Sequence, residues 1–406
     1  MAISPKTTAL QVTSVLNERF EKLLISTDEA IIDAGRKTEK QQLIESSEQN
    51  ESRRLLLVVE ELANKKKEVA ANAEQAYLQG VEDEFHKHLI QDLKVEFQDT
   101  KMIMDKVLRF DPSLGKLLDV LYTEACSISR LVSCLETLPW LETSILKYVR
   151  QPKYHRKDSS GQLIDLKTIR SALSFVGIES LRTLVPALIA KHALPSKSEF
   201  TPDLMKHLWV YTIGTGNAAK AIANKFDVRP EFAFNIGLFG NIGRTVITNL
   251  YLRAFDNKLR QQISKARKKN DLNQATALST LEPSSRYIVS LTKQYSAIIN
   301  ANIIKALNCR WLMIAIGFED FLKIKELNID HVKKLDLHPF ANLLFTAQGY
   351  MHYRMLAANK LIDKPAATAY LRSFGIDSSH LTILSKVNLT GIELNISGII
   401  EESEEK

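Results

Sequence analysis

The chain has 406 residues, of which 45% are hydrophobic and 25% are charged, and it carries a formal net charge of +7 at pH 7. This length and apolar content are enough for a buried core in roughly two or three domains, and they exclude wholesale disorder. The mild positive charge permits an anionic partner but does not require one, because many proteins use such a charge for solubility alone.

Cysteine usage and the ends of the chain indicate a cellular compartment. The three cysteines, Cys126, Cys134 and Cys309, show neither a disulfide framework nor metal-binding spacing. Such sparse usage is typical of a reducing environment. No basic-then-apolar leader opens the chain, and no uninterrupted apolar run reaches about 18 residues. We therefore expect a cytoplasmic protein that does not enter a membrane.

The distribution of apolar residues predicts an all-α fold. The chain contains only 15 glycines and 11 prolines. Alternating apolar and polar residues, typical of strands, are nearly absent, whereas apolar residues recur at i, i+3 and i+4 from end to end.

The first 105 residues are expected to form an N-terminal helical region. Residues 1–50 are polar and weakly periodic, with a short helix opening at Thr27. From residue 53 to residue 100 an apolar stripe predicts a long helix or a helical hairpin. The stripe is too short to establish a coiled coil. Packing of this element on the rest of the chain is favoured, and a homodimer formed through it stays open.

Further helices are predicted between prolines, glycines and polar turns. Thr201-Pro202-Asp203 is a clear helix start, with a capping hydroxyl, a proline in the first turn and an acidic residue near the positive end of the helix dipole. The other expected helices cover residues 112–125, 127–137, 141–149, 166–175, 178–193, 286–307, 311–322, 339–359 and 366–374.

Residues 231–246, EFAFNIGLFGNIGRTV, stand out as a buried helix. Gly237, Gly240 and Gly243 recur every three residues and leave a strip without side chains. Because each glycine inside a helix costs roughly 1 kcal/mol relative to alanine, three of them suggest a close approach of another backbone.

Several segments, in order, resemble the HDOD domain, an all-helical relative of the HD phosphohydrolases. The family's I-x-x-A-I-x-x-L-G-x-x-x-L-R pattern is similar to Ile169–Arg182, and its A-F-x-x-G-L-L-H-D-I-G-K pattern is similar to Ala233–Arg244. The resemblance covers residues 106–325. We expect an HD/HDOD-like helical domain there, an N-terminal helical region at 1–105, and a C-terminal helical extension with an acidic tail at 326–406.

The resemblance implies that the HD metal site is degenerate. The family's His-Asp pair falls on Gly240 and Asn241, and two other ligand positions fall on Tyr211 and Tyr295. None of these is a strong metal ligand, and metal-assisted hydrolysis needs several converging ligands. His207, one turn before Tyr211, is the only nearby candidate, and a lone helical histidine is seldom a ligand. We expect all four positions to be inert, with no metal, cofactor or catalytic residue.

A basic run at residues 253–269 is the second candidate site. Its cations could bind an anion such as phosphate. Aromatic residues for base stacking are missing apart from Phe255, so a solvated face is the simpler interpretation and nucleic acid is not an expected partner. The candidate anion-binding residues are Arg260, Lys265, Arg267, Lys268 and Lys269. The basic loop at 150–157 could join them in space.

Three functions follow from these observations. The resemblance implies bacterial signal transduction, so the first hypothesis is a non-catalytic regulatory protein that contacts signalling proteins through helical faces. The alternative is a nucleotide- or nucleic-acid-binding regulator that uses the basic run. A divergent metal-dependent phosphohydrolase is the least favoured, because the ligands are missing.

Overall fold

The all-α prediction is confirmed. The structure, a computed structural model, describes residues 9–39, 41–43, 58–154, 166–195, 203–392 and 394. Every regular element in these ranges is helical. Within them, no single helix combines the length and apolar composition needed to cross a bilayer, and only the helices Ile169–Val176 and Ile178–His192, bent by 114°, meet both criteria when taken together.

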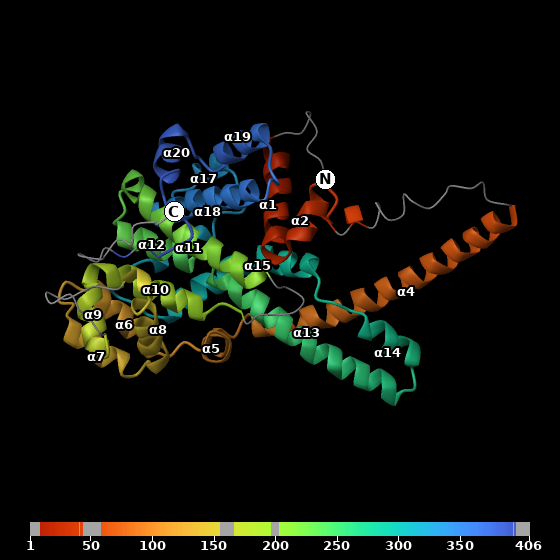
Figure 1. Ribbon diagram of the computed structural model, residues 1–406, viewed down its shortest axis with the longest axis horizontal. Coiled ribbons are helices and arrows are strands. Elements are labelled where there is room, and N and C mark those ends of the chain that lie inside the picture. The colour runs from red at the N-terminus through yellow and green to blue at the C-terminus, as the bar shows by residue number, and fades with distance from the viewer. Residues whose placement is uncertain are drawn as a thin grey trace.

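The elements follow one another along the chain as shown in Figure 1. The N-terminal part contains α1 (Ala9–Ile25), α2 (Thr27–Asp33), α4 (Val58–Glu96), α5 (Thr100–Met102) and the π-helical η1 (Ile103–Leu108). The middle part contains α6 (Ser113–Tyr122), α7 (Ile128–Leu135), α8 (Pro139–Val149), the 3-10 turn η2 (Pro152–Tyr154), α9 (Ile169–Val176), α10 (Ile178–His192), α11 (Leu204–Ile222), the 3-10 turn η3 (Ala223–Phe226), α12 (Pro230–Phe239), α13 (Ile242–Lys268) and α14 (Leu272–Ser279). The C-terminal part contains α15 (Ser285–Ala306), α16 (Ala315–Phe321), α17 (Ile329–Val332), α18 (Pro339–Ala358), α19 (Lys364–Ser373) and α20 (Ser378–Leu384).

The core is built around α11, which packs against both α12 and α18, and around the pair α13 and α15. Close backbone approach holds these pairs together. A Cβ added to Gly237 of α12 would lie 2.6 Å from the carbonyl oxygen of Thr215 on α11. A Cβ added to Gly243 of α13 would lie 2.0 Å from the carbonyl oxygen of Ser296 on α15. The close approach expected from these glycines is therefore confirmed.

The run 231–246 is not one helix, however, and that prediction was wrong. Helix α12 ends at Phe239 and α13 begins at Ile242, with Gly240 and Asn241 between them. Glycine and asparagine are poor helix formers, and together they let the chain turn. The glycines consequently face different partners: Gly240 approaches Leu344 of α18, whereas Gly237 and Gly243 approach α11 and α15.

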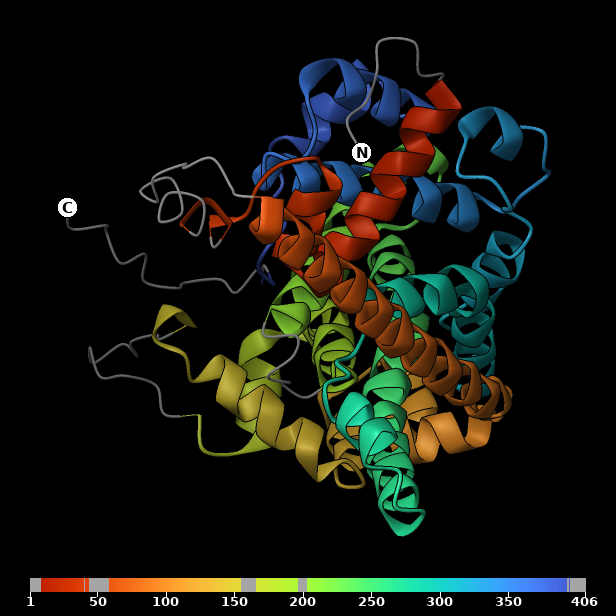
Figure 2. The same ribbon diagram turned by 90° about the vertical axis from the view of Figure 1, so that its right-hand side faces the viewer.

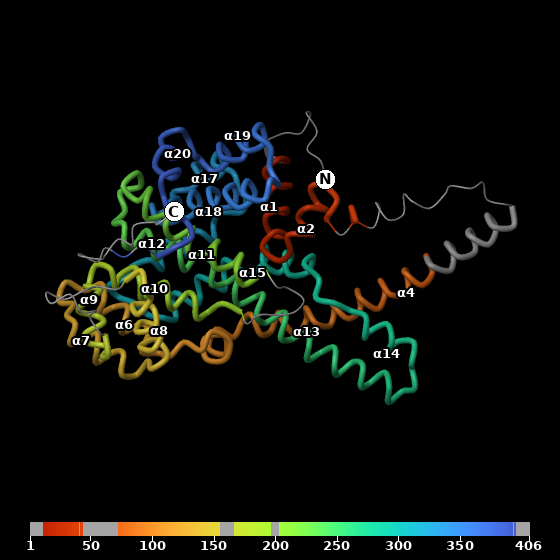
Figure 3. Tube along the Cα trace, in the orientation of Figure 1, coloured from red at the N-terminus to blue at the C-terminus, as the bar shows by residue number. Residues whose placement is uncertain are grey.

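Helix α1 was not predicted. Its buried residues Val12, Leu16, Phe20 and Leu23 follow a helical spacing that the surrounding polar residues obscure. α1 packs against α11, α15, α18 and α19. Figure 3 shows this first helix beside the C-terminal helices α18 and α19. The first helix and the C-terminal helices α18 and α19 thus pack together beside α11.

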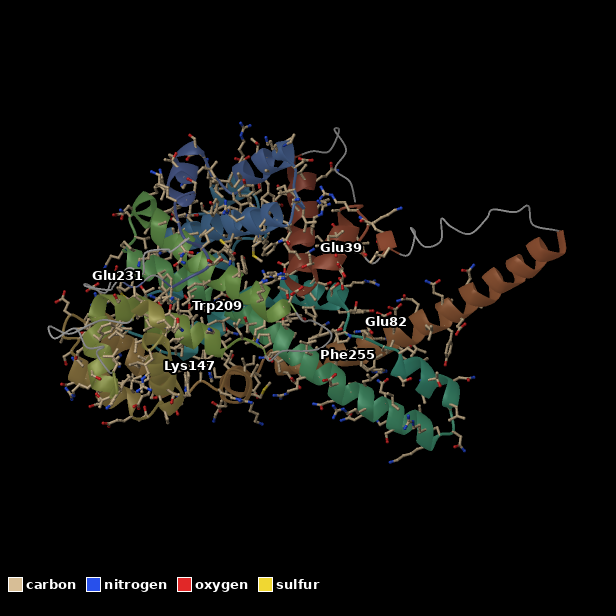
Figure 4. The ribbon with its side chains drawn as sticks, in the orientation of Figure 1. Glu39, Glu82, Lys147, Trp209, Glu231 and Phe255 are labelled. Atoms are coloured by element: carbon tan, nitrogen blue, oxygen red, sulfur yellow. The ribbon has the colours of Figure 1, made fainter. Side chains whose placement is uncertain are left out.

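Of the two alternatives predicted for residues 53–100, a long helix or a helical hairpin, the structure has the single helix α4 (Val58–Glu96). Its C-terminal half packs through Phe85, Leu89 and Leu93, all fully buried. Phe85 contacts Phe255 of α13 with ring centroids 5.0 Å apart, where the two helices cross (Figure 4). Together α4, α14 and the end of α13 project away from the other helices (Figures 1 and 2).

Candidate functional site

The candidate site lies at the break between α12 and α13. Asn241 is only 2% exposed. Neither its side-chain oxygen nor its side-chain nitrogen has a hydrogen-bond partner among the described residues. A buried unpaired amide of this kind lowers the stability of the folded state by roughly 1–3 kcal/mol, because its lost hydration is not replaced.

Beside it, Arg244 forms a buried ion pair with Glu21 of α1. The Nη1 of Arg244 donates to Oε2 of Glu21, and the two side chains are 13% and 12% exposed. The guanidinium also faces the Tyr211 ring, 5.4 Å from its centroid. Burial opposes the charge on Arg244, but Glu21 and Tyr211 outweigh that effect and raise the pKa of the guanidinium. Arg244 is therefore a fixed cation in the centre of the fold.

A chain of hydrogen bonds runs from Tyr211 of α11 through α18 and α19 to α1. The Tyr211 hydroxyl lies 2.8 Å from Nε2 of His352, and Nδ1 of His352 lies 3.0 Å from the Tyr370 hydroxyl. Tyr370 donates to Oδ1 of Asn17. Because Tyr370 uses its proton on Asn17, it accepts from Nδ1 of His352, which leaves Nε2 to accept from Tyr211.

This arrangement requires a neutral imidazole. Burial lowers the pKa of His352 well below its usual value of 6.5, and the positive charge of Arg244 lowers it further. Phe20 covers one face of the ring, with centroids 3.8 Å apart. His352 therefore acts as a neutral hydrogen-bond bridge.

We expect the stability of the protein to reveal this neutral histidine. Below about pH 6.5 the unfolded chain takes up a proton that folded His352 excludes, so the free energy of unfolding falls by up to about 1.4 kcal/mol for each pH unit below that value, until the folded imidazole also takes up a proton. His352→Gln removes the imidazole and with it this dependence of stability on pH. The destabilisation by the substitution, measured by urea unfolding, should accordingly be larger at pH 7 than at pH 5. An equal loss at both values would show that the imidazole is not held neutral.

A pocket of about 570 Å³ opens next to these groups. We call it the central pocket. Its walls come from α1, α13, α15, α16 and α18, and they include Glu21, Gly240, Arg244, Asn300 and His352. The pocket volume lies in the range of small-molecule sites. The Arg244–Glu21 pair thus forms part of the lining of the central pocket.

The structure brings together three of the four positions that the resemblance singled out. Tyr211, Gly240 and Asn241 lie around the break between α12 and α13. Tyr295 instead packs against Phe97, with ring centroids 5.1 Å apart, and does not line the central pocket. Helix α15 presents other residues to that pocket, namely Thr292, Lys293, Ser296, Ala297 and Asn300.

His207 also lies outside the lining of the central pocket. Burial lowers the pKa of this histidine, although Asp203 and hydrogen bonds to the backbone of Leu23 and Leu24 oppose the shift. Its Nδ1 has no partner among the described residues. In the described part of the chain, no three His, Cys, Asp or Glu side chains group as a metal site would require.

The residues of the central pocket do not fit the metal centre that the HD resemblance implies. Glu21 is held by Arg244, and both ring nitrogens of His352 are engaged by tyrosines. The Arg244 cation would repel a divalent metal placed beside it. Hydrolysis through a metal-bound water therefore finds no ligand set here.

The basic run lies on the projecting end of α13 and its residues divide between two sides of the helix. Lys265 and Lys269 line a hollow of about 310 Å³ against α4 and α14. Arg260, Arg267 and Lys268 line a separate hollow of about 470 Å³. The five cations therefore do not form one continuous anion-binding face. The 155–157 part of the basic loop lies outside the described residues.

Sequence reasoning missed Glu21 and His352 and did not assign Arg244 a role. Arg244 aligns with the lysine that ends the family's D-I-G-K pattern, which was an available signal. Glu21 lies in the N-terminal segment that shows weak periodicity, and His352 lies beyond the span of the resemblance. No local pattern could have joined them.

Comparisons with known proteins found one family model and two solved structures. Residues 109–284 match the family model described as the HDOD domain. Among solved structures, the chain is similar to a "putative phosphohydrolase" from Shewanella amazonensis SB2B, with a TM-score of 0.41 and 20% identity over 72% of this chain and 91% of that chain. It is also similar to a "putative metal-dependent phosphohydrolase" from the same organism, with a TM-score of 0.38 and 13% identity over 71% of this chain and 97% of that chain.

No curated protein matches the chain. The matched span begins just before α6, includes the break between α12 and α13, and ends just before α15. It therefore contains Tyr211, Gly240 and Asn241 but neither Glu21 nor His352. The resemblance seen in the sequence is confirmed, and residues 109–284 of this chain form an HDOD domain.

Proposed function

We propose that this protein is a non-catalytic regulator that acts by contacting other signalling proteins in the cytoplasm. One observation carries the proposal: the buried Arg244–Glu21 pair stands beside the positions where an HD enzyme would hold its metal. An enzyme of that kind needs ligands that lower the pKa of bound water. A fixed guanidinium supplies the opposite electrostatic environment.

The surroundings of the pair support a structural role. Phe20 and Glu21 come from α1, Tyr211 from α11, Arg244 from α13, and His352 from α18. The Arg244–Glu21 ion pair and the hydrogen bonds of His352 with Tyr211 and Tyr370 link these helices to one another and to α19. The degenerate centre thus joins the HDOD domain to its N- and C-terminal extensions, and it leaves the outer helical faces for partners.

The second candidate, a nucleic-acid-binding regulator, has less support. Lys258 of the basic run is paired with Asp92 at 2.6 Å, and the five candidate cations divide between two hollows. Strong phosphate binding requires several cations along one track. We therefore favour protein contacts.

We expect the purified full-length chain to contain substoichiometric metal and to hydrolyse no bis(p-nitrophenyl) phosphate when Mg²⁺, Mn²⁺, Fe²⁺ or Co²⁺ is added. The reason is that the central pocket lacks a set of converging metal ligands, which metal-assisted hydrolysis needs. The measurement is metal analysis by mass spectrometry on protein prepared without chelators, with absorbance assays in parallel.

Two variants make the test specific to this site. Stoichiometric metal together with turnover that His352→Gln abolishes would overturn the proposal, because it would show a working centre around His352. Turnover retained in both His352→Gln and Glu21→Gln would point to a contaminating hydrolase and would leave the proposal standing.

A further inference from the structure

A second hollow, of about 980 Å³, lies away from the degenerate centre. It runs between helices α5 to α7, the last two of which begin the HDOD domain, and the loop that follows α15. Its floor includes the buried side chains of Phe110, Val120 and Leu307. We call it the Trp311 groove, after the aromatic residue at its edge.

The wall that carries Trp311 is held rigidly. Both backbone N–H groups of Arg310 and Trp311 donate to the carboxylate of Asp119 on α6, at 2.7 and 2.8 Å. The backbone of Leu307 also approaches Gly115 so closely that a Cβ there would lie 2.0 Å from the Leu307 carbonyl oxygen. These contacts explain why the helix predicted from residue 311 begins only at Ala315. They also hold the backbone of Trp311 in place.

Large apolar side chains are exposed on this wall and just beyond it. Trp311, which lines the groove, is 56% exposed, and Met313 and Ile316, which follow it in the chain outside the groove lining, are 63% and 48% exposed. Tryptophan, methionine and arginine are enriched in the centres of protein interfaces. A tryptophan whose backbone is already held loses less conformational freedom on binding than one on a flexible loop. This wall therefore has the character of an interface hot spot.

The charged residues of the groove are mainly positive. Its lining contains the four cations Lys101, Lys116, Arg130 and Arg310, against the acids Asp105 and Asp119. Asp119 is occupied by the backbone of residues 310 and 311. Among the described residues, none of the four cations forms a salt bridge. The groove thus offers an apolar floor with a cationic rim.

We propose that the Trp311 groove binds an acidic amphipathic helix of a partner protein, whose apolar face lies against Trp311 and whose carboxylates meet Lys116 and Arg310. This inference rests on the proposed function and names the surface that would serve it. The apolar floor suits a helix inserted into a groove. Single-stranded nucleic acid fits less well, because Trp311 is the only aromatic side chain exposed in the groove as the structure describes it, and successive bases need successive stacking platforms.

The probe is a synthetic fluorescein-labelled peptide of about 18 residues, roughly five helical turns, with Leu and Phe on one face and Glu elsewhere. Its binding to the full-length chain is measured by fluorescence anisotropy. We expect saturable binding that weakens as salt is added, because rim cations contribute through long-range attraction. Trp311→Ala should weaken the affinity about tenfold or more, as expected for a central aromatic anchor. The pair Lys116→Glu and Arg310→Glu should remove most of the binding.

Matched controls separate the groove from the general surface. Leu272→Ala removes an exposed apolar side chain on α14, and Lys305→Glu reverses an exposed charge outside the groove; both should bind as the parent does. A peptide with the same composition but a dispersed apolar face, and one with Lys in place of Glu, should bind much more weakly.

Equal binding of these peptides, or an affinity unchanged by Trp311→Ala, would overturn the groove proposal. So would absence of binding to the acidic peptide, or a preference for oligo-dT that depends on Trp311. None of these results would affect the proposed function, which the metal and hydrolysis measurements test independently. Conversely, a metal-dependent activity at His352 would remove the proposed function and leave peptide binding to be judged on its own.

Discussion

Replacing Glu21 by leucine is expected to lower the free energy of unfolding by about 3–5 kcal/mol. The substitution leaves the buried guanidinium of Arg244 without its carboxylate, in a site where both side chains are nearly removed from solvent. An uncompensated buried charge is costly because its lost hydration is not replaced. Urea unfolding of the full-length chain, followed by circular dichroism, gives the measurement.

The double variant Glu21→Leu with Arg244→Met separates the charge effect from simple loss of packing. Removing both charges avoids the unpaired guanidinium, so the double variant should be clearly more stable than Glu21→Leu alone. Glu319→Leu is the matched control. It breaks an exposed ion pair of 3.3 Å with Lys305, and exposed pairs contribute only about 0–1 kcal/mol. If the destabilising effects of Glu21→Leu and Arg244→Met, each measured alone, simply added in the double variant, the two side chains would have no energetic coupling. The ion pair would then not hold α1 and α13 together.

The same pair shows why the candidate site could be predicted only in part. Local patterns were sufficient for the helical class, and for starts such as Pro339 of α18, because proline and capping residues act over a few positions. They were also sufficient to identify Ile169–Arg182, where α9 and α10 form around Gly177. The positions that correspond to the family's His-Asp pair, Gly240 and Asn241, could be located from the order of motifs. The Arg244–Glu21 pair beside them could not.

The polar contacts around Arg244 join residues that lie far apart in the sequence. Glu21 and Arg244 are 223 positions apart, and Tyr211 and His352 are 141 positions apart. Periodicity in one segment carries no information about which distant helix it meets. The break at Gly240 was missed for a related reason: glycine spacing suggests close approach, but it does not say that three glycines face three different helices. Tertiary packing decided both points.

The second large effect is expected at Gly243, where α13 and α15 nearly touch. In Gly243→Ala the new Cβ would lie 2.0 Å from the Ser296 carbonyl oxygen and 3.1 Å from the Asn300 backbone nitrogen. Both neighbours are backbone atoms, so no flexible side chain can move aside. The helices must separate, which also stretches the 3.1 Å bond from the Gly243 N–H to Oδ1 of Asn300. We expect a loss of roughly 1–3 kcal/mol in the free energy of unfolding.

Gly80→Ala is the opposite case within the same chain. Gly80 lies inside α4, and a Cβ added there meets nothing within 4 Å. Alanine should therefore stabilise the helix by about 0.5–1 kcal/mol, since glycine loses more conformational freedom on folding. The free energy of unfolding measured with urea should therefore fall in Gly243→Ala and rise in Gly80→Ala, relative to the parent. If Gly243→Ala were also neutral or stabilising, α13 and α15 would have to stand farther apart, and the central pocket between them would need a different shape.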